Sequence, residues 1–364
     1  MKQEQLNKII EKHQHYLNKD IDGWETMKAD LSYKNLSGLD LSNANLRNAD
    51  LRNANLYKAN LINADLAYTD LRNANLRNAD LSCANLRKAD LAYTDLRNAY
   101  LRDANLRNAD LSCANLRKAD LADADLSNAY LRETDLCRAF CCYVNLYKAN
   151  LNNANLREAN LYGANLSYVD LRDADLRKAD LRDADLNNAD LRDADLNNAC
   201  LRYANLRKTA LRNVDLSETD MYEADLKEAN LFGSDLKNTN IVCAVINEDT
   251  KIDYPITCPE TGSFIGYKKA VSGKIVKLQI CEDAKRSSAT TKKCRCSKAL
   301  VLAIENIDES DSGLQGIASI YDPSFIYRVG EIVEVSDFDD NRWRECAPGI
   351  HFFMDRQDAV EYEF

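Results

Sequence analysis

A five-residue period constrains this chain more than any other feature. From Ala29 to Ile241, the order of a small residue, Asn or Asp, Leu and two mostly polar residues recurs without an inserted residue. The Leu positions run from 31 to 241 in steps of five, which makes 43 repeats, and all but Cys141, Met221 and Ile241 hold Leu. This fixed period overrides the two or three ordinary domains that 364 residues would otherwise suggest.

Neither an α-helix nor a β-strand can bury a Leu at every fifth position. A step of five turns by about 140° on a helix, and on a strand it changes face each time. The period therefore predicts a bend inside each repeat. Asn and Asp suit such a bend because their side chains bond to nearby backbone groups and tolerate turn conformations. Four bends would close a coil of about 20 residues, with Leu and the Ala two places earlier facing a narrow interior.

The repeats resemble the pentapeptide-repeat family, whose pattern is A-(D/N)-L-x-x. The resemblance implies a mainly β protein, a right-handed quadrilateral β-helix of about eleven coils, here expected over residues 29–246. Some members of the family mimic DNA and bind type II topoisomerases. That alternative requires a strongly acidic surface, whereas residues 29–241 hold 32 acidic and 28 basic side chains. The near balance, and the lack of an inserted loop, argue against DNA mimicry.

Residues 1–28 are predicted to form an N-terminal helical cap. Apolar and aromatic residues recur at helical spacing over residues 2–18, at Leu6, Ile9, Ile10, His13, Tyr16 and Leu17. A coil that begins a solenoid leaves its apolar interior open, and a terminal element must cover it. We expect this helix, with Trp24 beside the first repeats, to do so. The alternative is a helix that docks a partner, and we assign no role to His13 or His15.

Sorting the repeats by a 20-residue coil places several aromatic residues on one side. This side carries Tyr100, Phe140, Cys142, Tyr143, Tyr162, Tyr203 and Tyr222. Exposed aromatic side chains gathered on one face indicate a partner-binding site, and the irregular repeat around Phe140 is its centre. The alternative is that Tyr is simply well tolerated on β-sheet surfaces.

The period stops after Ile241, and residues 247–364 are predicted to form a C-terminal α+β domain. This part of the chain holds all four Pro and seven of the eleven Gly. Alternating patterns predict strands over residues 273–280, 299–304, 325–329, 331–335 and 350–354, and a helix over 355–362. Segments 258–269, 286–290 and 345–353 resemble a domain often appended to bacterial and phage pentapeptide repeats. That resemblance implies no function.

Basic residues in this domain suggest a site for a phosphate group or a nucleic-acid backbone. The candidates are Lys268, Arg286, Lys292, Lys293 and Arg295. The alternative is a basic loop in solvent. Cys294 and Cys296 could contribute to a zinc site, but structural zinc sites usually have two to four residues between paired Cys. Lys268, Glu260, Cys346 and His351 contain enough chemistry for catalysis, yet no spacing fixes their geometry, so we predict no catalytic residue.

Composition narrows the function further. The net charge of −10 argues against general nucleic-acid affinity of the repeats. No apolar segment approaches the ~20 residues that span a membrane. Twelve Cys without a signal-peptide core predict free thiols and a cytoplasmic location. We expect a non-enzymatic scaffold that binds another protein and needs no cofactor. The alternative is an enzyme or a phosphate- or nucleic-acid-binding domain carried on a structural repeat region.

Overall fold

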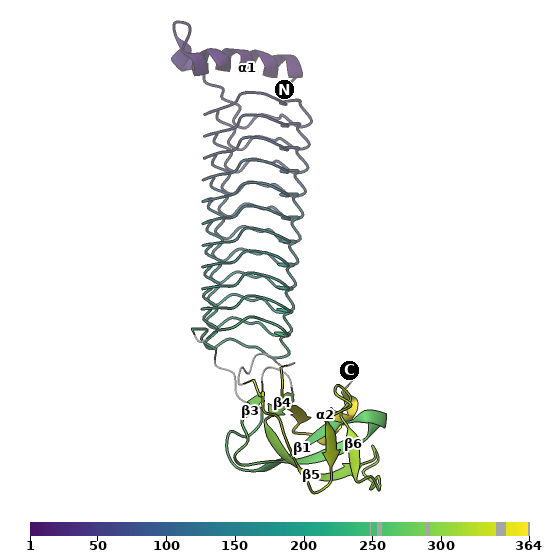
Figure 1. The fold of residues 1–364 in the computed structure, drawn as a ribbon. Coiled ribbons are helices and arrows are strands. Elements are labelled where there is room, and N and C mark those ends of the chain that lie inside the picture. Colours follow the sequence, from purple (N-terminus) through teal and green to yellow (C-terminus); the bar gives the residue numbers. More distant parts are fainter. Residues whose placement is uncertain (248, 253–256, 289–291, 340–346, 363–364) are drawn as a thin grey trace. The chain divides into compact units, whose positions relative to one another are not determined.

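The computed structural model describes residues 1–247, 249–252, 257–288, 292–339 and 347–362. The chain divides into two compact units. The first comprises Met1–Asn240 and Val245–Asp253, and the second comprises Ile241–Ala244 and Tyr254–Phe364. Stacked coils dominate the first unit and a β-sheet dominates the second (Figure 1).

Residues 29–240 form a stack of 20-residue coils, which we call the coil stack. In almost every repeat, the residue before Leu forms a parallel β-bridge with the residue 20 positions later, as in Asp30 with Asp50 and Asp50 with Asp70. Backbone bonds run to both neighbouring coils: Asp50 N–H donates to the carbonyl of Ala29 at 3.0 Å, and Leu51 N–H donates to that of Asp70 at 2.8 Å. The expected β-helix is therefore confirmed.

Each repeat bends at a turn that its own residues hold. Ala54 N–H donates to the carbonyl of Leu51 at 3.1 Å, and Asn53, the third residue of this turn, has a φ of 56°. The Asp50 carboxylate accepts the N–H of Arg52 at 3.1 Å. Asn tolerates this left-handed conformation better than most residues. The bend that the Asn and Asp residues predict thus occurs with the expected side-chain bond.

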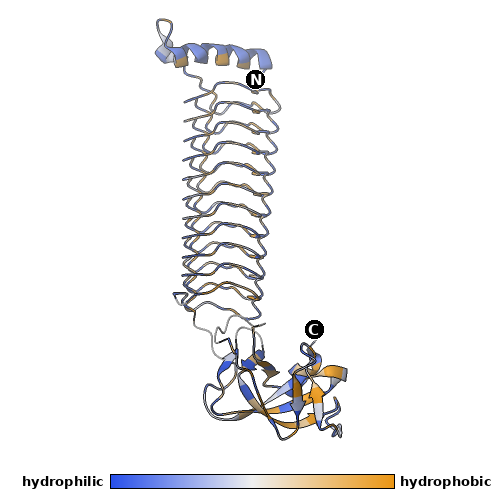
Figure 2. Cartoon of the chain, in the orientation of Figure 1, coloured by the Kyte–Doolittle hydropathy of each residue, from blue (hydrophilic) through white to orange (hydrophobic). Residues whose placement is uncertain are grey.

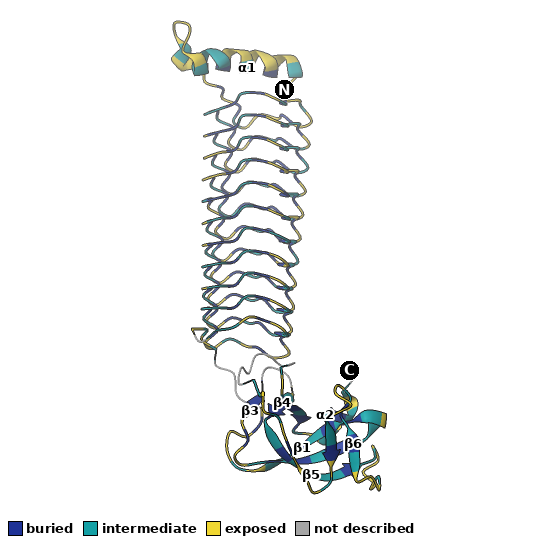
Figure 3. Cartoon of the chain, viewed as in Figure 1, coloured by how far each residue is buried: buried dark blue, intermediate teal, exposed yellow. Residues whose placement is uncertain are grey.

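The interior of the coil stack is apolar and narrow. Leu46 and Ala49 are 0% and 1% exposed, and other repeats are similar (Figure 3). Thr replaces Ala in several repeats and keeps its hydroxyl bonded: Thr94 Oγ1 donates to the carbonyl of Leu71 at 3.0 Å. Burial of so many aliphatic groups stabilises the stack.

Helix α1 (Gln3–Asn18) lies against the first coils, followed by the short 3-10 helix η1 (Trp24–Met27). The Gln3 side-chain amide bonds to the backbone of Asp40 in both directions, donating at 2.7 Å and accepting at 3.0 Å. Leu6 of α1 is fully buried. Within the described residues, neither α-helix is long and apolar enough to cross a membrane.

His13, for which the sequence suggested no role, links α1 to the beginning and the end of the first 20-residue coil. It is fully buried, its Nδ1 lies 3.0 Å from the N–H of Ala29, and its Nε2 lies 2.9 Å from the carbonyl of Arg47. Because an N–H must donate and a carbonyl must accept, the ring is neutral with its proton on Nε2. Burial lowers the pKa of His13 below its usual value.

The described residues of the second unit form nine strands and one short α-helix. The elements are β1 (Phe264–Lys269), the 3-10 helix η2 (Val271–Gly273), β2 (Ile275–Ile280), β3 (Arg286–Ser288), β4 (Lys293–Cys296), β5 (Lys298–Glu305), β6 (Gly316–Ala318), β7 (Ile326–Arg328), β8 (Ile332–Glu334), β9 (Ile350–Phe353) and α2 (Arg356–Glu361).

Seven strands form an antiparallel sheet in the order β3-β4-β9-β1-β2-β5-β8, and β6 pairs with β7. One face packs a core that includes Val276, Leu278 and Tyr327, and α2 covers Ile275 and Phe353 on the other. The apolar residues concentrate in these strands (Figure 2). Strands β2, β5, β7, β8 and β9 match expected segments within a few residues. In contrast, the basic segment at 293–296 is a strand, and Arg295 is only 2% exposed, so it is not a loop in solvent.

Candidate functional site

The coil register places two of the candidate aromatic residues in one ladder. Tyr100 and Phe140 each form a parallel bridge with Asp120, which lies between them. Both occupy the position that Asn or Asp fills in most repeats, and they are 53% and 42% exposed. An apolar ring therefore replaces a turn-forming side chain at two levels of the same surface.

The densest group of these residues lies in two successive coils. Tyr143 N–H donates to the carbonyl of Tyr162 at 2.9 Å, and the two rings meet edge to face with centroids 5.4 Å apart. Gly163 lies beneath Tyr143, and a Cβ there would overlap its ring. Phe140 precedes Tyr143 on the same coil. We call Phe140, Tyr143 and Tyr162 the aromatic cluster.

Arginine covers the other aromatic pair on this side. The rings of Tyr203 and Tyr222 are 5.9 Å apart, and the Arg202 guanidinium lies 5.7 Å and 4.9 Å from their centroids. Such cation–π contacts stabilise the free protein and reduce the exposed ring surface. Over the described part of the chain, no cation lies over Phe140 or Tyr143. Within the aromatic cluster, the Arg182 guanidinium lies 5.7 Å from the centroid of the Tyr162 ring, so Phe140 and Tyr143 are its open members.

Exposed aromatic residues also occur outside the side that the sequence analysis singled out. Tyr130 is 57% exposed and stands in the ladder of Asp110 and Asn150, half a coil away from that of Phe140. Others are Tyr33, Tyr68, Tyr93, Tyr168 and Phe232. Their positions in the 20-residue register are readable from the sequence. Tyr147 and Tyr168 also meet edge to face on adjacent coils, with centroids 5.7 Å apart, and Lys148 lies over both rings. Exposure and pairing alone therefore do not distinguish the aromatic cluster; the third ring, Phe140, does.

The two cysteines next to Phe140 are poor nucleophiles. Cys141 faces the interior, and burial raises the pKa of its thiol. The pKa of Cys142 is raised by partial burial and by the carboxylates of Asp180 and Asp120. A thiolate is the reactive form, so neither side chain is prepared for nucleophilic catalysis at neutral pH.

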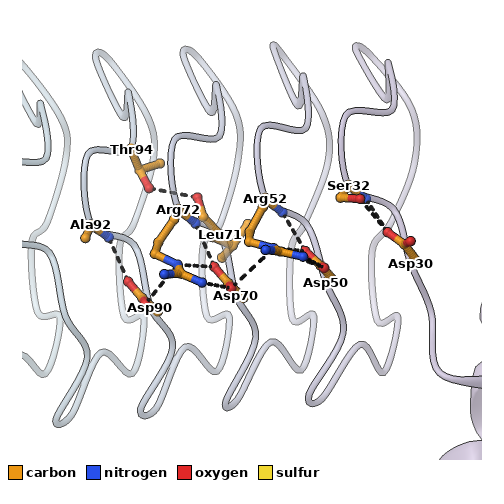
Figure 4. A network of polar contacts seen from close by, with 10 residues as sticks. All are labelled: Asp30, Ser32, Asp50, Arg52, Asp70, Leu71, Arg72, Asp90, Ala92 and Thr94. Carbon is orange, nitrogen blue, oxygen red and sulfur yellow. Dashed lines mark hydrogen bonds and ion pairs between the residues drawn. The ribbon is translucent and has the colours of Figure 1, made fainter.

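Many charged side chains on the coil stack pair with each other along the ladders (Figure 4). Arg72 binds Asp70 of its own repeat at 2.5 Å and reaches Asp90 of the next coil at 3.2 Å. Partial burial raises the pKa of Asp70, but hydrogen bonds from Arg72 outweigh this effect and its pKa is lowered. These carboxylates form turns and ion pairs. Such a surface alternates in charge, which disfavours mimicry of DNA.

Three of the five basic candidates are engaged in contacts within the C-terminal unit. Arg286 Nη2 donates to the carbonyls of Cys281 and Glu282, both at 2.8 Å. Arg295 donates to the carbonyl of Pro348 at 3.1 Å. Lys292 pairs with Asp358 at 2.6 Å. These side chains support the sheet and its connections, and they do not converge on one site.

The other two candidates, Lys268 and Lys293, line one pocket together with His351. The pocket has a volume of about 510 Å³, and Phe325 and Tyr327 form part of its apolar wall. Arg286 is not part of it. Both lysines were candidates from the sequence. Nothing in the sequence indicated that they line one pocket, because β1 and β4 are separated in the sheet by β9.

Lys268 has an unusual environment. Its side chain is 7% exposed, and its ammonium lies 5.9 Å from the centroid of the Tyr327 ring. Burial, followed by the positive charge of Lys293, lowers the pKa of Lys268 to about 8. A buried amine near neutral pKa is typical of binding and catalytic sites as well as of some structural positions.

The cysteine candidates for zinc are both buried. Cys294 and Cys296 lie on the same face of β4. Cys258 is near Cys294, whose hydrogen bond lowers the pKa of Cys258 to about 7. Nowhere in the described residues do three or more His, Cys, Asp or Glu side chains gather so as to hold a metal. Cys346 lies outside the described residues.

Comparisons with known proteins agree with the repeat structure. The family described as pentapeptide repeats (8 copies) matches overlapping segments from residue 28 to residue 238, and a family of unknown function (DUF5758) matches residues 254–359. Among curated proteins, none matches this chain by sequence.

Solved structures of three pentapeptide-repeat or related proteins are similar to parts of the chain. HetL, involved in heterocyst differentiation regulation in the cyanobacterium Nostoc, is 30% identical, with 66% of this chain and 97% of HetL covered and a TM-score of 0.31. Rfr23 from the cyanobacterium Cyanothece is 33% identical, with 29% and 64% covered and a TM-score of 0.15. The plasmid-mediated fluoroquinolone resistance protein QnrB1, in a trypsin-treated form, is 15% identical, with 60% and 92% covered and a TM-score of 0.32.

The family match covers more than half of the chain and coincides with the stacked coils, their turns and their Leu interior. This protein therefore belongs to the pentapeptide-repeat family and carries a C-terminal DUF5758 domain.

Proposed function

We propose that this protein is a non-enzymatic scaffold that binds another protein through the aromatic cluster on its coil stack. The single observation that carries the proposal is the exposure of Phe140 and Tyr143, 42% and 57%, beside Tyr162 on adjacent coils. Aromatic residues at the centre of an interface contribute more binding free energy than most other side chains.

The coil stack suits such a role because its surface is preorganised. Backbone hydrogen bonds to both neighbouring coils hold each repeat, and Gly163 leaves room for Tyr143. A rigid aromatic surface loses little conformational entropy on binding. In contrast, a long flexible side chain would have to be ordered first.

The surroundings of the aromatic cluster indicate the chemistry of the partner. Arg102 pairs with Asp123 at 3.3 Å, and Arg182 pairs with Asp180 at 2.6 Å, so neither sign of charge dominates. The proposed partner is a protein surface with an apolar centre and a mixed polar rim, which is the usual composition of a protein–protein interface. The cytosol is the proposed location, and the C-terminal domain would contribute a second contact.

The proposal includes two finer features of the coil stack. Its coils turn in the right-handed sense that the family resemblance implies, and they number about eleven, because 43 repeats are arranged four to a coil. Neither feature affects which residues reach the surface, since the 20-residue register alone determines the ladders.

A pair of matched variants tests the aromatic cluster. Phe140→Asp and Tyr130→Asp each restore the acidic residue typical of that repeat position, on ladders half a coil apart. Both variants should unfold at the temperature of the wild type. Quantitative cross-linking in lysate from the source cells should then yield a protein that the wild type and Tyr130→Asp capture and that Phe140→Asp does not. Equal capture by the two variants would show that the cluster does not bind the partner.

A further inference from the structure

The pocket in the C-terminal unit combines buried positive charge with apolar walls. Its volume of about 510 Å³ lies within the range of ~300–1,000 Å³ typical of small-molecule sites. Strand β1 contributes Lys268, β4 contributes Lys293, and β7 contributes Tyr327. All three strands belong to the same compact unit.

Lys268 lacks the compensation that other lysines of this unit have. Lys269 Nζ donates to the carbonyl of Val360 at 2.8 Å, and Lys298 Nζ pairs with Asp283 at 2.7 Å. Lys268 is 7% exposed, and within the described ranges its ammonium, which lines the pocket, has neither a hydrogen-bond nor an ion-pair partner. Its described contact is the Tyr327 ring. Removing an ammonium from water without a partner costs free energy, so a partner supplied from outside would be bound favourably.

A second positive charge lies at the same pocket. Lys293 is half-buried, and its Nζ donates to the Tyr362 hydroxyl at 3.2 Å. The two ammonium groups carry like charges and repel each other, which lowers the pKa of Lys268 further after burial. An anion placed between them would replace this repulsion by two attractions.

The acidic residues of the pocket do not supply that anion. Asp322 and Asp337 are both exposed. The Asp322 carboxylate already accepts hydrogen bonds from the N–H and the hydroxyl of Ser324, at 2.9 Å and 2.5 Å. Neither of these two carboxylates pairs with the buried ammonium of Lys268. Among the described residues of the pocket, no carboxylate therefore neutralises Lys268, which an external anion would do.

The rest of the pocket wall favours an apolar group on the ligand. Phe325 and Tyr327 meet edge to face with centroids 5.2 Å apart. Val335, Pro348 and Ile350 continue this surface. Burial of apolar surface contributes roughly 25 cal/mol per Å², so a bare inorganic anion would leave most of the available binding free energy unused.

We propose that this pocket binds a small organic anion, a phosphate ester or a carboxylate, whose charged group lies against Lys268 and Lys293 and whose apolar body packs on Phe325 and Tyr327. This site is independent of the aromatic cluster on the coil stack. It gives the C-terminal domain a ligand-binding role.

Calorimetric titration of the full chain with three probes of similar shape tests the proposal. The probes are phenyl phosphate, benzoate and the uncharged benzyl alcohol. At least one anion should bind about tenfold more tightly than benzyl alcohol, which corresponds to one favourable charged contact. Tighter binding of phenyl phosphate than of benzoate would assign a phosphate ester, and the reverse order would assign a carboxylate.

Three variants determine whether the lysines provide the contact. Lys268→Met should reduce anion binding to the level of benzyl alcohol, and Lys293→Met should weaken it. Lys277→Met is the matched control, because Lys277 lies on the neighbouring strand β2 and outside the pocket lining, and it should bind like the wild type. Circular dichroism verifies that each variant is folded. If Lys268→Met does not fold, loss of binding in Lys293→Met alone carries the test.

Two results would overturn the proposal. One is equal affinity for the anions and benzyl alcohol, which includes the absence of binding by all three at about 10 mM. The other is unchanged anion binding in folded Lys268→Met and Lys293→Met.

Discussion

The coil stack and the C-terminal domain treat their polar groups in opposite ways. In the coil stack the Asx side chains, many arginines and the buried Thr hydroxyls find partners in their own repeat or in a neighbouring coil, as Asp50 does with Arg52 and Thr94 does with Leu71. In the C-terminal domain, Lys268 is buried next to Lys293 without a described counter-charge. In a periodic structure, a polar contact that is satisfied in one repeat is satisfied in the equivalent repeats as well. An aperiodic structure can hold a buried charged group without a counter-charge at a single position, and such positions are candidate binding sites.

The largest expected effect concerns the periodic interior. Leu106→Ala and Leu176→Ala should each destabilise the coil stack by about 2–5 kcal/mol, because each removes a fully buried side chain from a narrow core. The two costs should be similar, since each repeat meets equivalent neighbours. Chemical denaturation of both variants measures them. Very different costs would mean that the coils are not equivalent and would break the comparison.

The cap of the coil stack depends on a less periodic contact. His13→Phe should cost about 2–4 kcal/mol, because it leaves the N–H of Ala29 and the carbonyl of Arg47 buried without their partner. Faster hydrogen exchange at the Ala29 amide would report the loss. Tyr16→Phe is the control, since it retains the ring that stacks on His13 at 5.3 Å. Unchanged exchange in His13→Phe would contradict this role.

The same histidine predicts a pH dependence. The folded-state pKa of His13 is lowered from 6.5, so the unfolded chain binds more protons than the folded chain as the pH falls. Its stabilising contribution is complete above about pH 6.5 and is lost as the pH falls toward the lowered pKa of the folded state. Thermal unfolding between pH 7 and pH 5 should show this loss in the wild type and a smaller one in His13→Phe.

A smaller effect of opposite sign is expected in the C-terminal domain. Lys268→Met should stabilise the ligand-free protein by about 1–3 kcal/mol, because it removes a buried ammonium that has no described partner. Lys277→Met should leave the unfolding temperature nearly unchanged. A destabilised Lys268→Met would show that the lysine supports the fold, and the contrast between the two regions would be lost.

The smallest effect tests how completely the coil stack satisfies its polar groups. Thr94→Val should change the free energy of unfolding by at most about 1 kcal/mol. The carbonyl of Leu71 would still accept the N–H of Ala74 at 3.0 Å, so no buried acceptor loses its last partner. Chemical denaturation should place Thr94→Val far closer to the wild type than Leu106→Ala. A loss comparable to that of Leu106→Ala would contradict this account.

The sites differ in how much of them the sequence predicts, because some of their contacts follow the 20-residue register and others do not. The register alone puts Tyr100 and Phe140 in one ladder, because residues 20 apart are neighbours. It equally puts Tyr130 on another ladder, which the sequence analysis passed over. His13 was missed because its two partners, 16 and 34 residues away, are backbone groups without a side-chain signal. The basic residues around Cys294 predicted a shared site, yet only Lys293 of that segment lines the pocket, since Arg295 and Lys292 are engaged elsewhere.

The sequence by itself determined the coil stack: the bend in each repeat, the Leu and Ala interior and the outward ladders. The physical reason is that each contact joins residues at a fixed short separation, so one local rule specifies the whole unit. Only the tertiary structure decided the pocket, because its contacts join segments far apart in the chain, as Lys293 of β4 joins Tyr362 after α2 over 69 residues. Lys268 lies on β1, which pairs with β2 and β9 in the middle of the sheet. The alternation of residues along a strand does not reveal which inward position will be buried near a second lysine.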